Sequence, residues 1–265
     1  MFFLSCALFI LGLLIGSFLN VLIDRLPNNE SPFKGRSHCD HCRRTLGAFD
    51  LIPVISFLIL GGKCRSCKKK ISWQYPVVEL FTGAMFLFLF SFFSKNQIFY
   101  SFEFPNFLGL ASLLILFCSF LVIFVADLKY QIIPDEMLVS AVLAIVIYHL
   151  ISTPLSWMFL FNHLTSGIAG AGFFLGIYAL TRGRGIGFGD VKLTFLLGLF
   201  LGFPGILIGL YGAFLTGAAV SSILIISGKK HWGQRIAFGP FLIFGTVTSF
   251  FFGNSLLQWY FSLLH

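Results

Sequence analysis

Apolar runs long enough to cross a membrane recur along this chain of 265 residues, and they constrain its fold more than any other feature. An uncharged run over residues 1–23 is followed by runs at about 77–94, 106–126, 137–152, 162–181, 190–203, 204–227 and 239–262. A helix needs about 20 apolar residues to cross roughly 30 Å of hydrocarbon. Only 11% of the residues are charged, against about 25% in a soluble domain. The pattern predicts an all-α polytopic membrane protein with about eight transmembrane helices.

The runs divide the chain into four expected parts. These are a first transmembrane helix (1–23), a cytoplasmic loop (24–76), a second transmembrane helix with an external loop (77–105) and a C-terminal transmembrane region (106–265). The first run lacks the basic start of a cleaved signal peptide, so we expect it to stay as a helix. The run 190–203 is short and is followed by the break Gly-Phe-Pro-Gly, so it either crosses the membrane or re-enters it.

The basic residues indicate how these helices are oriented. Ten of the 18 Lys and Arg lie between Arg25 and Lys70. With residues 24–76 in the cytoplasm, only Lys95 remains outside, which is a strong positive-inside signal and places both termini outside. Anionic lipid headgroups explain the net charge of +8. Because the charge follows the topology rather than a groove-reading motif, we expect membrane lipids and no nucleic acid as partners.

Four of the six cysteines form two pairs in the loop, Cys39 with Cys42 and Cys64 with Cys67, separated by 21 residues. Two such pairs can supply four thiolates to one tetrahedral metal, and a closed four-cysteine shell is typical of a structural zinc site. An iron–sulfur centre or a redox pair are the alternatives, whereas a reducing cytoplasm argues against disulfides. His38 and His41 are spare ligands at most.

The segment Leu-Ile-Pro-Val-Ile-Ser-Phe-Leu-Ile-Leu, residues 51–60, is apolar but too short to cross a membrane. It either fills the interior of the zinc loop or lies on the membrane surface.

Acidic residues are rare after residue 105, where four remain, and the expected topology places each at a cytoplasmic helix end. Asp135 and Glu136 follow Pro134, which is a helix-start pattern. Asp127 closes its span, where the helix dipole disfavours an anion. Asp190 follows Gly185, Gly187 and Gly189, which would let the backbone bend toward another helix.

Two aspartates at membrane depth suggest an aspartic-protease pair. Ionisable residues there are costly and usually functional. Two carboxyls that share a site cannot both ionise easily, so one acts as a general base on water while the protonated one polarises the substrate carbonyl. The alternative is that Asp127 and Asp190 lie at headgroup level, paired with Lys129 and Lys192.

Six motifs in one order are more specific than any one of them. They are "GSFLNVLIDRLP" (16–27), the two cysteine pairs, "ISWQYPVVELFTG" (71–83), "DLKYQIIPDEM" (127–137), "GFGDVKL" (187–193) and "FGPFL" (238–242). Together they resemble the bacterial prepilin peptidases, also called type IV leader peptidases, over nearly the whole chain.

The resemblance implies a Gly-x-Gly-Asp intramembrane aspartic protease of the bacterial inner membrane. It would cut the basic leader from prepilins and pseudopilins at the cytoplasmic face, upstream of pilus or secretion machinery. The catalytic pair carries over to Asp127 and Asp190, and zinc to the four cysteines. Many members then methylate the new N-terminus with S-adenosylmethionine, and the N-terminal region and cysteine loop are linked to that activity.

Glu79, in "YPVVELFTG", is expected at the start of the second span. It is either a helix-start acid favoured by the dipole or a contact to the substrate or to methyl transfer. The sequence has no glycine-rich nucleotide-binding motif, so the methyltransferase activity rests on the resemblance alone. A proton-relay transporter and a non-enzymatic zinc-loop scaffold remain as rival functions.

Overall fold

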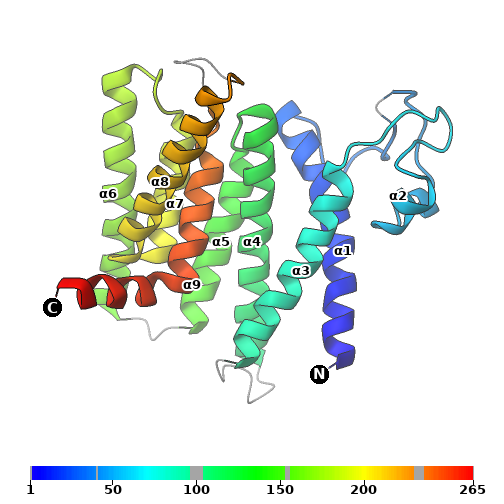
Figure 1. Ribbon diagram of the computed structural model, residues 1–265. Helices are drawn as coiled ribbons and strands as arrows, with labels where there is room; N and C mark the ends of the chain where they lie inside the picture. The colour runs from blue at the N-terminus through cyan, green and yellow to red at the C-terminus, as the bar shows by residue number, and fades with distance from the viewer. Residues whose placement is uncertain (1, 40, 96–103, 153–155, 230–235, 265) are drawn as a thin grey trace. The chain divides into compact units, whose positions relative to one another are not determined.

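The computed structural model, which describes residues 2–39, 41–95, 104–152, 156–229 and 236–264, is almost entirely helical in these ranges (Figure 1). The described residues include two short 3-10 helices, η1 (Leu26–Asn28) and η2 (Ala48–Leu51). The α-helices in chain order are α1 (Phe2–Arg25), α2 (Ile55–Ile59), α3 (Gln74–Lys95), α4 (Phe104–Tyr130), α5 (Asp135–Ser152), α6 (Trp157–Thr181), α7 (Phe188–Leu201), α8 (Gly205–Ile226) and α9 (Gly239–Leu264).

Seven helices in the described ranges are long and apolar enough to cross a membrane: α1, α3, α4, α5, α6, α8 and α9. The prediction of an all-α multi-pass membrane protein is therefore confirmed. The expected eighth crossing is α7, which has 14 residues and is about 21 Å long, short of the roughly 30 Å of hydrocarbon. The external loop expected before residue 105 falls largely on residues 96–103, which lie outside the described residues.

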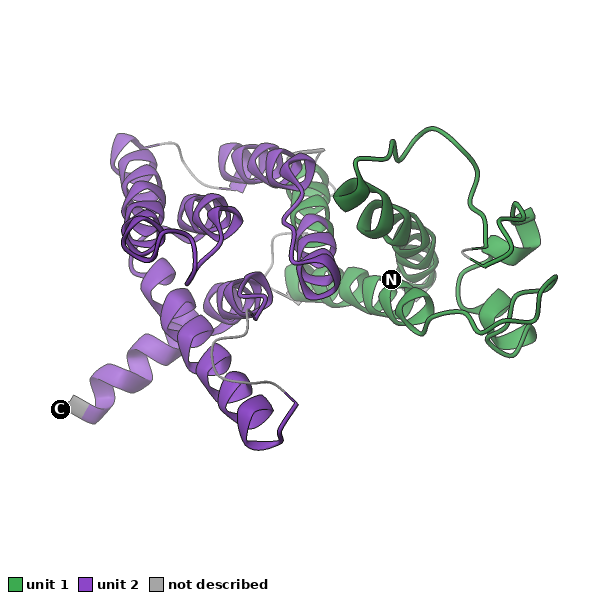
Figure 2. Cartoon of the chain, turned by 90° about the horizontal axis from the view of Figure 1, so that it is seen from above, with its two compact units in different colours: residues 1–118 green, residues 119–265 purple. Residues whose placement is uncertain are grey.

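The chain forms two compact units, residues 1–118 and residues 119–265, and α4 continues from one into the other (Figure 2). In the first unit α1 packs along α3. Glycines let the two backbones approach: a Cβ on Gly12 would lie 2.7 Å from Cα of Gly83, and one on Gly16 would lie 2.7 Å from Cα of Glu79. Close packing through small residues is how membrane helices associate without a strong hydrophobic driving force.

In the second unit α6 packs on α7 and α8 packs on α9. Gly198 of α7 meets Gly167 of α6, and Gly245 of α9 meets the backbone of Gly209 in α8, with no room for a side chain at either crossing. The short helix α7 also contacts α5, α8 and α9. Its side chains are accordingly buried over most of its length, which explains how so short a helix keeps a fixed position. The buried residues are Asp190, Val191, Leu193, Thr194, Leu196, Leu197, Gly198 and Phe200.

Candidate active site and metal centre

Asp127 lies in the last turn of α4 and is 6% exposed. Its Oδ2 accepts a hydrogen bond of 2.9 Å from the backbone N–H of Gly239, the first residue of α9. The first N–H groups of a helix have no partner within that helix, so Asp127 caps α9. The dipole of α4 disfavours a carboxylate at this end, but the positive N-terminal end of α9 offsets that effect.

Asp190 is the third residue of α7 and is 8% exposed. Its Oδ2 accepts a hydrogen bond of 3.0 Å from the backbone N–H of Gly187, which precedes the helix. A carboxylate at this position caps its own helix and lies at the favourable end of the helix dipole. The second aspartate is therefore also held by the backbone N–H of a glycine.

The glycines before Asp190 do not act as the bend that the sequence led us to expect. Gly187 has an ordinary extended backbone, with φ of −77°. A Cβ on Gly189 would lie 3.2 Å from Ile133, so this glycine allows α7 to pack against the segment between α4 and α5. The chain reverses direction earlier, at Arg182 and Gly183, where φ is positive.

The two aspartates interact electrostatically although they are 63 positions apart in the chain. Asp190 lies within electrostatic range of Asp127 in the same compact unit. Two contacts hold the start of α7 next to the segment that follows Asp127. One is the packing of Gly189 on Ile133, and the other is the ion pair of Lys192 Nζ with both oxygens of Asp135, at 2.7 and 2.9 Å.

This ion pair argues against the alternative in which Asp190 is a headgroup-level acid paired with Lys192. Lys192 was a possible partner of Asp190, but its ammonium binds Asp135, the first residue of α5. Asp135 and Glu136 both lie in the first turn of α5, so the prediction that they start a helix is confirmed. Lys129 lies over the ring of Tyr130, at 5.0 Å from its centroid.

The arrangement is suited to general acid–base chemistry. Among the described residues, the hydrogen bonds found to each aspartate reach only Oδ2, which leaves Oδ1 of both carboxyls for water or substrate. Two neighbouring carboxyls in a buried site favour sharing one proton between them. The sequence did not predict that the N–H groups of Gly239 and Gly187 hold the two aspartates. Gly239 could have been found from the Gly-Pro pair at the start of the last apolar run, which is a helix-start pattern.

The four cysteines of the loop come together in a cluster of the kind that can hold a metal ion. The sulfur atoms of Cys39, Cys42, Cys64 and Cys67 all lie within 4.8 Å of one another, and those of Cys39 and Cys67 are 3.8 Å apart. In a tetrahedral site with metal–sulfur bonds of about 2.3 Å, the sulfurs are roughly 3.8 Å apart. The donor set therefore fits such an ion. His38 and His41 are exposed and are not part of the group.

The two cysteine pairs form matching turns. The carbonyl of Cys39 accepts from the N–H of Arg43 and that of Cys64 accepts from the N–H of Lys68, at 2.9 and 3.0 Å. Arg43 and Lys68 both have positive φ, of 56° and 58°. Isolated β-bridges, His38 with Thr45 and Lys63 with Lys70, close the two turns in the same way. The repeated geometry presents the two thiols of each turn to a common point.

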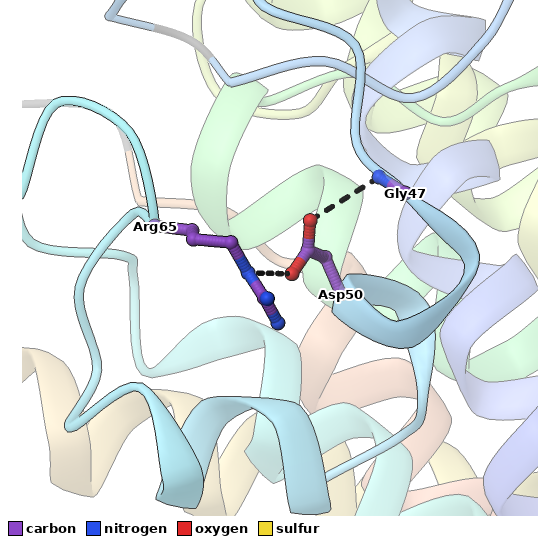
Figure 3. Close-up of polar contacts among 3 residues, drawn as sticks. All are labelled: Gly47, Asp50 and Arg65. Atoms are coloured by element: carbon purple, nitrogen blue, oxygen red, sulfur yellow. Dashed lines mark hydrogen bonds and ion pairs between the residues drawn. The ribbon is translucent and has the colours of Figure 1, made fainter.

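An ion pair stabilises the second turn, which holds Cys64 and Cys67. Nε of Arg65 donates to Oδ1 of Asp50 at 2.8 Å, and Oδ2 of Asp50 accepts from the N–H of Gly47 at 3.2 Å (Figure 3). This contact joins η2 to the second cysteine pair. The backbone N–H groups of Cys67 and Ser66 lower the pKa of the Cys64 thiol to about 6, and a thiolate is the form that binds a metal.

Glu79 does not start its helix. Because α3 begins at Gln74, Glu79 lies in the second turn, where it is buried. Its Oε2 accepts a hydrogen bond of 2.7 Å from the backbone N–H of Val54, the residue before α2. Glu79 also accepts from Ser17 of α1. It therefore ties the cysteine-bearing loop to α1 and α3.

Comparison with protein families gives two adjacent matches. Residues 10–93 match the Bacterial Peptidase A24 N-terminal domain, and residues 114–222 match the Type IV leader peptidase family. The first match contains the four cysteines and Glu79, and the second contains both aspartates.

Similar proteins carry the name prepilin leader peptidase/N-methyltransferase. One from Bacillus subtilis (strain 168) is 31% identical over 253 residues, which cover 96% of each chain. One from Aeromonas hydrophila is 29% identical over 95% of this chain and 92% of its own, and one from Burkholderia pseudomallei (strain 1026b) is 30% identical over 92% and 84%. No solved structure matches the chain. The resemblance drawn from the six motifs is confirmed.

Proposed function

We propose, from the premise that the chain belongs to the type IV leader peptidase family, that it is a membrane-embedded aspartic endopeptidase acting on prepilins and pseudopilins. It removes their basic leader at the membrane surface. One observation carries the proposal most directly: Asp127 and Asp190 are both buried, interact electrostatically, and are each held by the backbone N–H of a glycine.

The proposed reaction is hydrolysis without a covalent intermediate. The ionised aspartate accepts a proton from water, and the water oxygen attacks the carbonyl carbon of the scissile peptide bond. The protonated aspartate donates a hydrogen bond to the carbonyl oxygen, where negative charge develops. When the C–N bond breaks, the leaving amine takes up a proton from the pair, which returns to its singly protonated state.

The loop is proposed to bind one structural zinc ion through Cys39, Cys42, Cys64 and Cys67. The separations between the four sulfurs support this reading, and four thiolates close the coordination shell. When bound, zinc would supply a rigid link between the two turns. The residues of the loop then present Val54 to Glu79.

A second activity is proposed from the names of the relatives: N-methylation of the new N-terminus, with S-adenosylmethionine as the methyl donor. The described residues form no strand-to-helix nucleotide fold, so the fold by itself indicates no set of contacts for this cofactor. Glu79 is the proposed contact to the substrate amine or to methyl transfer. It is an acid at the junction of the loop with α1 and α3.

The proposed location is the bacterial inner membrane, with both termini outside and the cysteine loop and aspartates on the cytoplasmic side. The distribution of Lys and Arg supports this orientation. The proposed domains of the chain are a first helix (1–23), a zinc loop (24–76), a second helix with an external loop (77–105) and a peptidase region (106–265). Pilus or secretion machinery would use the processed product.

The test is cleavage of a purified prepilin by the purified enzyme in lipid nanodiscs, followed by mass spectrometry. Asp127→Asn and Asp190→Asn should each insert normally and stop cleavage, because each leaves the pair without one of its two roles. Glu136→Gln is the matched control: it neutralises an exposed acid in the first turn of α5 and should cleave as well as wild type. Full cleavage by either Asn variant removes that aspartate from the proposed pair. A transporter or a scaffold would show no cleavage in any variant.

A further inference from the structure

The short helix α2 has one apolar side chain turned inward and three turned outward. Phe57 is 8% exposed and packs against the ring of Trp73, with centroids 4.9 Å apart. Ile55, Leu58 and Ile59 are 54%, 68% and 76% exposed. Residues at spacings i, i+3 and i+4 share one side of a helix. These three residues, the outer face of α2, leave apolar surface uncovered in a loop that also holds a polar metal centre.

A hydrogen bond holds α2 beside the start of α3, which is a candidate membrane span. Val54, directly before α2, donates to Glu79, which is five residues after the start of α3 at Gln74 and two residues inside the apolar run that begins at about residue 77. At 1.5 Å per residue these two distances along the helix are about 7.5 Å and about 3 Å. Figure 1 shows α2 beside the first turns of α3 rather than beyond its end.

The opposite side of the loop descends to a similar depth along α1. The ring of Phe33 contacts that of Phe18, with centroids 6.1 Å apart. Phe18 lies seven residues before the end of α1 at Arg25, or about 10 Å along the helix. Both margins of the loop therefore fold back beside membrane helices. This depth matches the boundary between headgroups and acyl chains, where amphipathic helices lie about 5–10 Å deep.

The lysines that follow α2 in the chain indicate which kind of surface its outer face contacts. Lys63, Lys68, Lys69 and Lys70 are all exposed, and the bridge between Lys63 and Lys70 gathers them at one turn. Exposed apolar residues beside clustered lysines are typical of segments that bind anionic lipid. The same lysines would repel the basic leader of a prepilin. The lipid surface therefore fits this face better than the substrate does.

We propose that the outer face of α2 inserts into the lipid–water interface, with the four lysines on anionic headgroups. The metal-binding loop is then held by the membrane as well as by Glu79. This proposal does not depend on the reaction at the aspartates, so either can fail without the other.

The experiment is photolabelling of the wild-type protein in nanodiscs of phosphatidylethanolamine and phosphatidylglycerol. One phospholipid carries a diazirine near the carbonyl end of an acyl chain, and labelled peptides are identified by mass spectrometry. The peptide that contains Ile55–Ile59 should be labelled like the ends of the membrane helices. The polar turn Cys39–Arg44 should not be labelled. Nanodiscs of phosphatidylcholine alone should give weaker labelling of α2, because they lack the anionic headgroups.

A pair of variants tests whether the apolar face is responsible. Leu58→Glu with Ile59→Glu should reduce labelling of α2 about tenfold or more, since two apolar side chains leave the hydrocarbon boundary. The matched control, Leu58→Ile with Ile59→Leu, keeps the apolar character and should label like wild type. Circular dichroism and the content of bound metal establish whether each variant folds.

Three results would overturn the proposal. The first is a wild-type α2 that stays unlabelled while the membrane helices are labelled. The second is equal labelling of the Glu variant and wild type. The third is crosslinking of α2 to a prepilin that carries the same diazirine, with no labelling by lipid; this would make the face a protein-docking site. If the Glu variant does not fold, the wild-type labelling alone decides the question.

Discussion

Replacing Gly239 by alanine should disable Asp127 without unfolding the protein. A Cβ at this position would lie 2.7 Å from Oδ2 of Asp127, whereas ordinary contacts begin at 3.4 Å. The carboxyl or the start of α9 must therefore move by about 0.7 Å. A movement of that size lengthens the 2.9 Å hydrogen bond to about 3.6 Å, at which it no longer counts as a hydrogen bond.

The expected magnitude follows from the kind of bond that is lost. A hydrogen bond to a charged group contributes roughly 1.5–3 kcal/mol, which corresponds to about a ten- to hundredfold loss in kcat/KM. Loss of the same bond should lower the free energy of unfolding by at most a similar amount, and part of that loss is offset because Gly239 has no positive φ and alanine is the better helix former. The measurement is kcat/KM for prepilin cleavage in nanodiscs, together with thermal unfolding.

Two matched glycines make the prediction sharper. A Cβ on Gly187 would lie 3.4 Å from Oδ2 of Asp190, an ordinary contact, so Gly187→Ala should lose much less activity than Gly239→Ala. Gly172 has open space around it, and Gly172→Ala should behave like wild type. The reasoning is refuted if a folded Gly239→Ala enzyme retains wild-type kcat/KM, or if Gly187→Ala is the more damaging of the two.

Three further predictions concern the supports of these sites. Asp135→Lys and Lys192→Asp should each lower cleavage about two- to fivefold, because the pair is exposed, and the double exchange should restore it; a double variant worse than both singles argues against a positioning role. Glu79→Gln keeps an oxygen that can accept from Val54, so it should retain cleavage and loop structure but lose methyl transfer; unchanged methylation would leave Glu79 a purely structural role. Removing metal with a chelator should increase proteolysis within the loop while cleavage persists, because the aspartates belong to the other compact unit; a loop equally resistant without metal would argue against a structural ion.

The sequence predicts the helices well because each long apolar run must become a helix in lipid, where backbone groups have no other partners. The boundaries were missed where polar residues continue a helix beyond its apolar part. Gln74, Tyr75 and Pro76 lie before the expected start of α3 yet belong to it. That shift of three residues moved Glu79 from the first turn into the second, and changed its role from a helix-start acid to an anchor for the loop.

The partners of the aspartates depend on tertiary structure. Gly239 is 112 residues from Asp127, and no local pattern joins the two. The local contact of Asp190 with Gly187 was open to prediction, since a carboxylate at the third position of a helix reaches back to the residue before it. It was also predictable that Lys192 does not pair with Asp190, because residues two apart on a helix do not face each other.

The choice of hydrogen-bond donors explains how two carboxyls can share a site and remain reactive. A lysine bound to either one would keep it ionised and remove its ability to carry the shared proton. A backbone N–H fixes one oxygen in place but adds no full charge. Here both aspartates use an N–H from glycine, and the nearby ammonium of Lys192 is engaged by Asp135 on a different helix. The ion pair secures the start of α7, and Lys192, two residues after Asp190, faces another side of that helix. Losing Asp135 and losing Lys192 should therefore harm cleavage to a similar extent, because either change removes the contact that holds the start of α7.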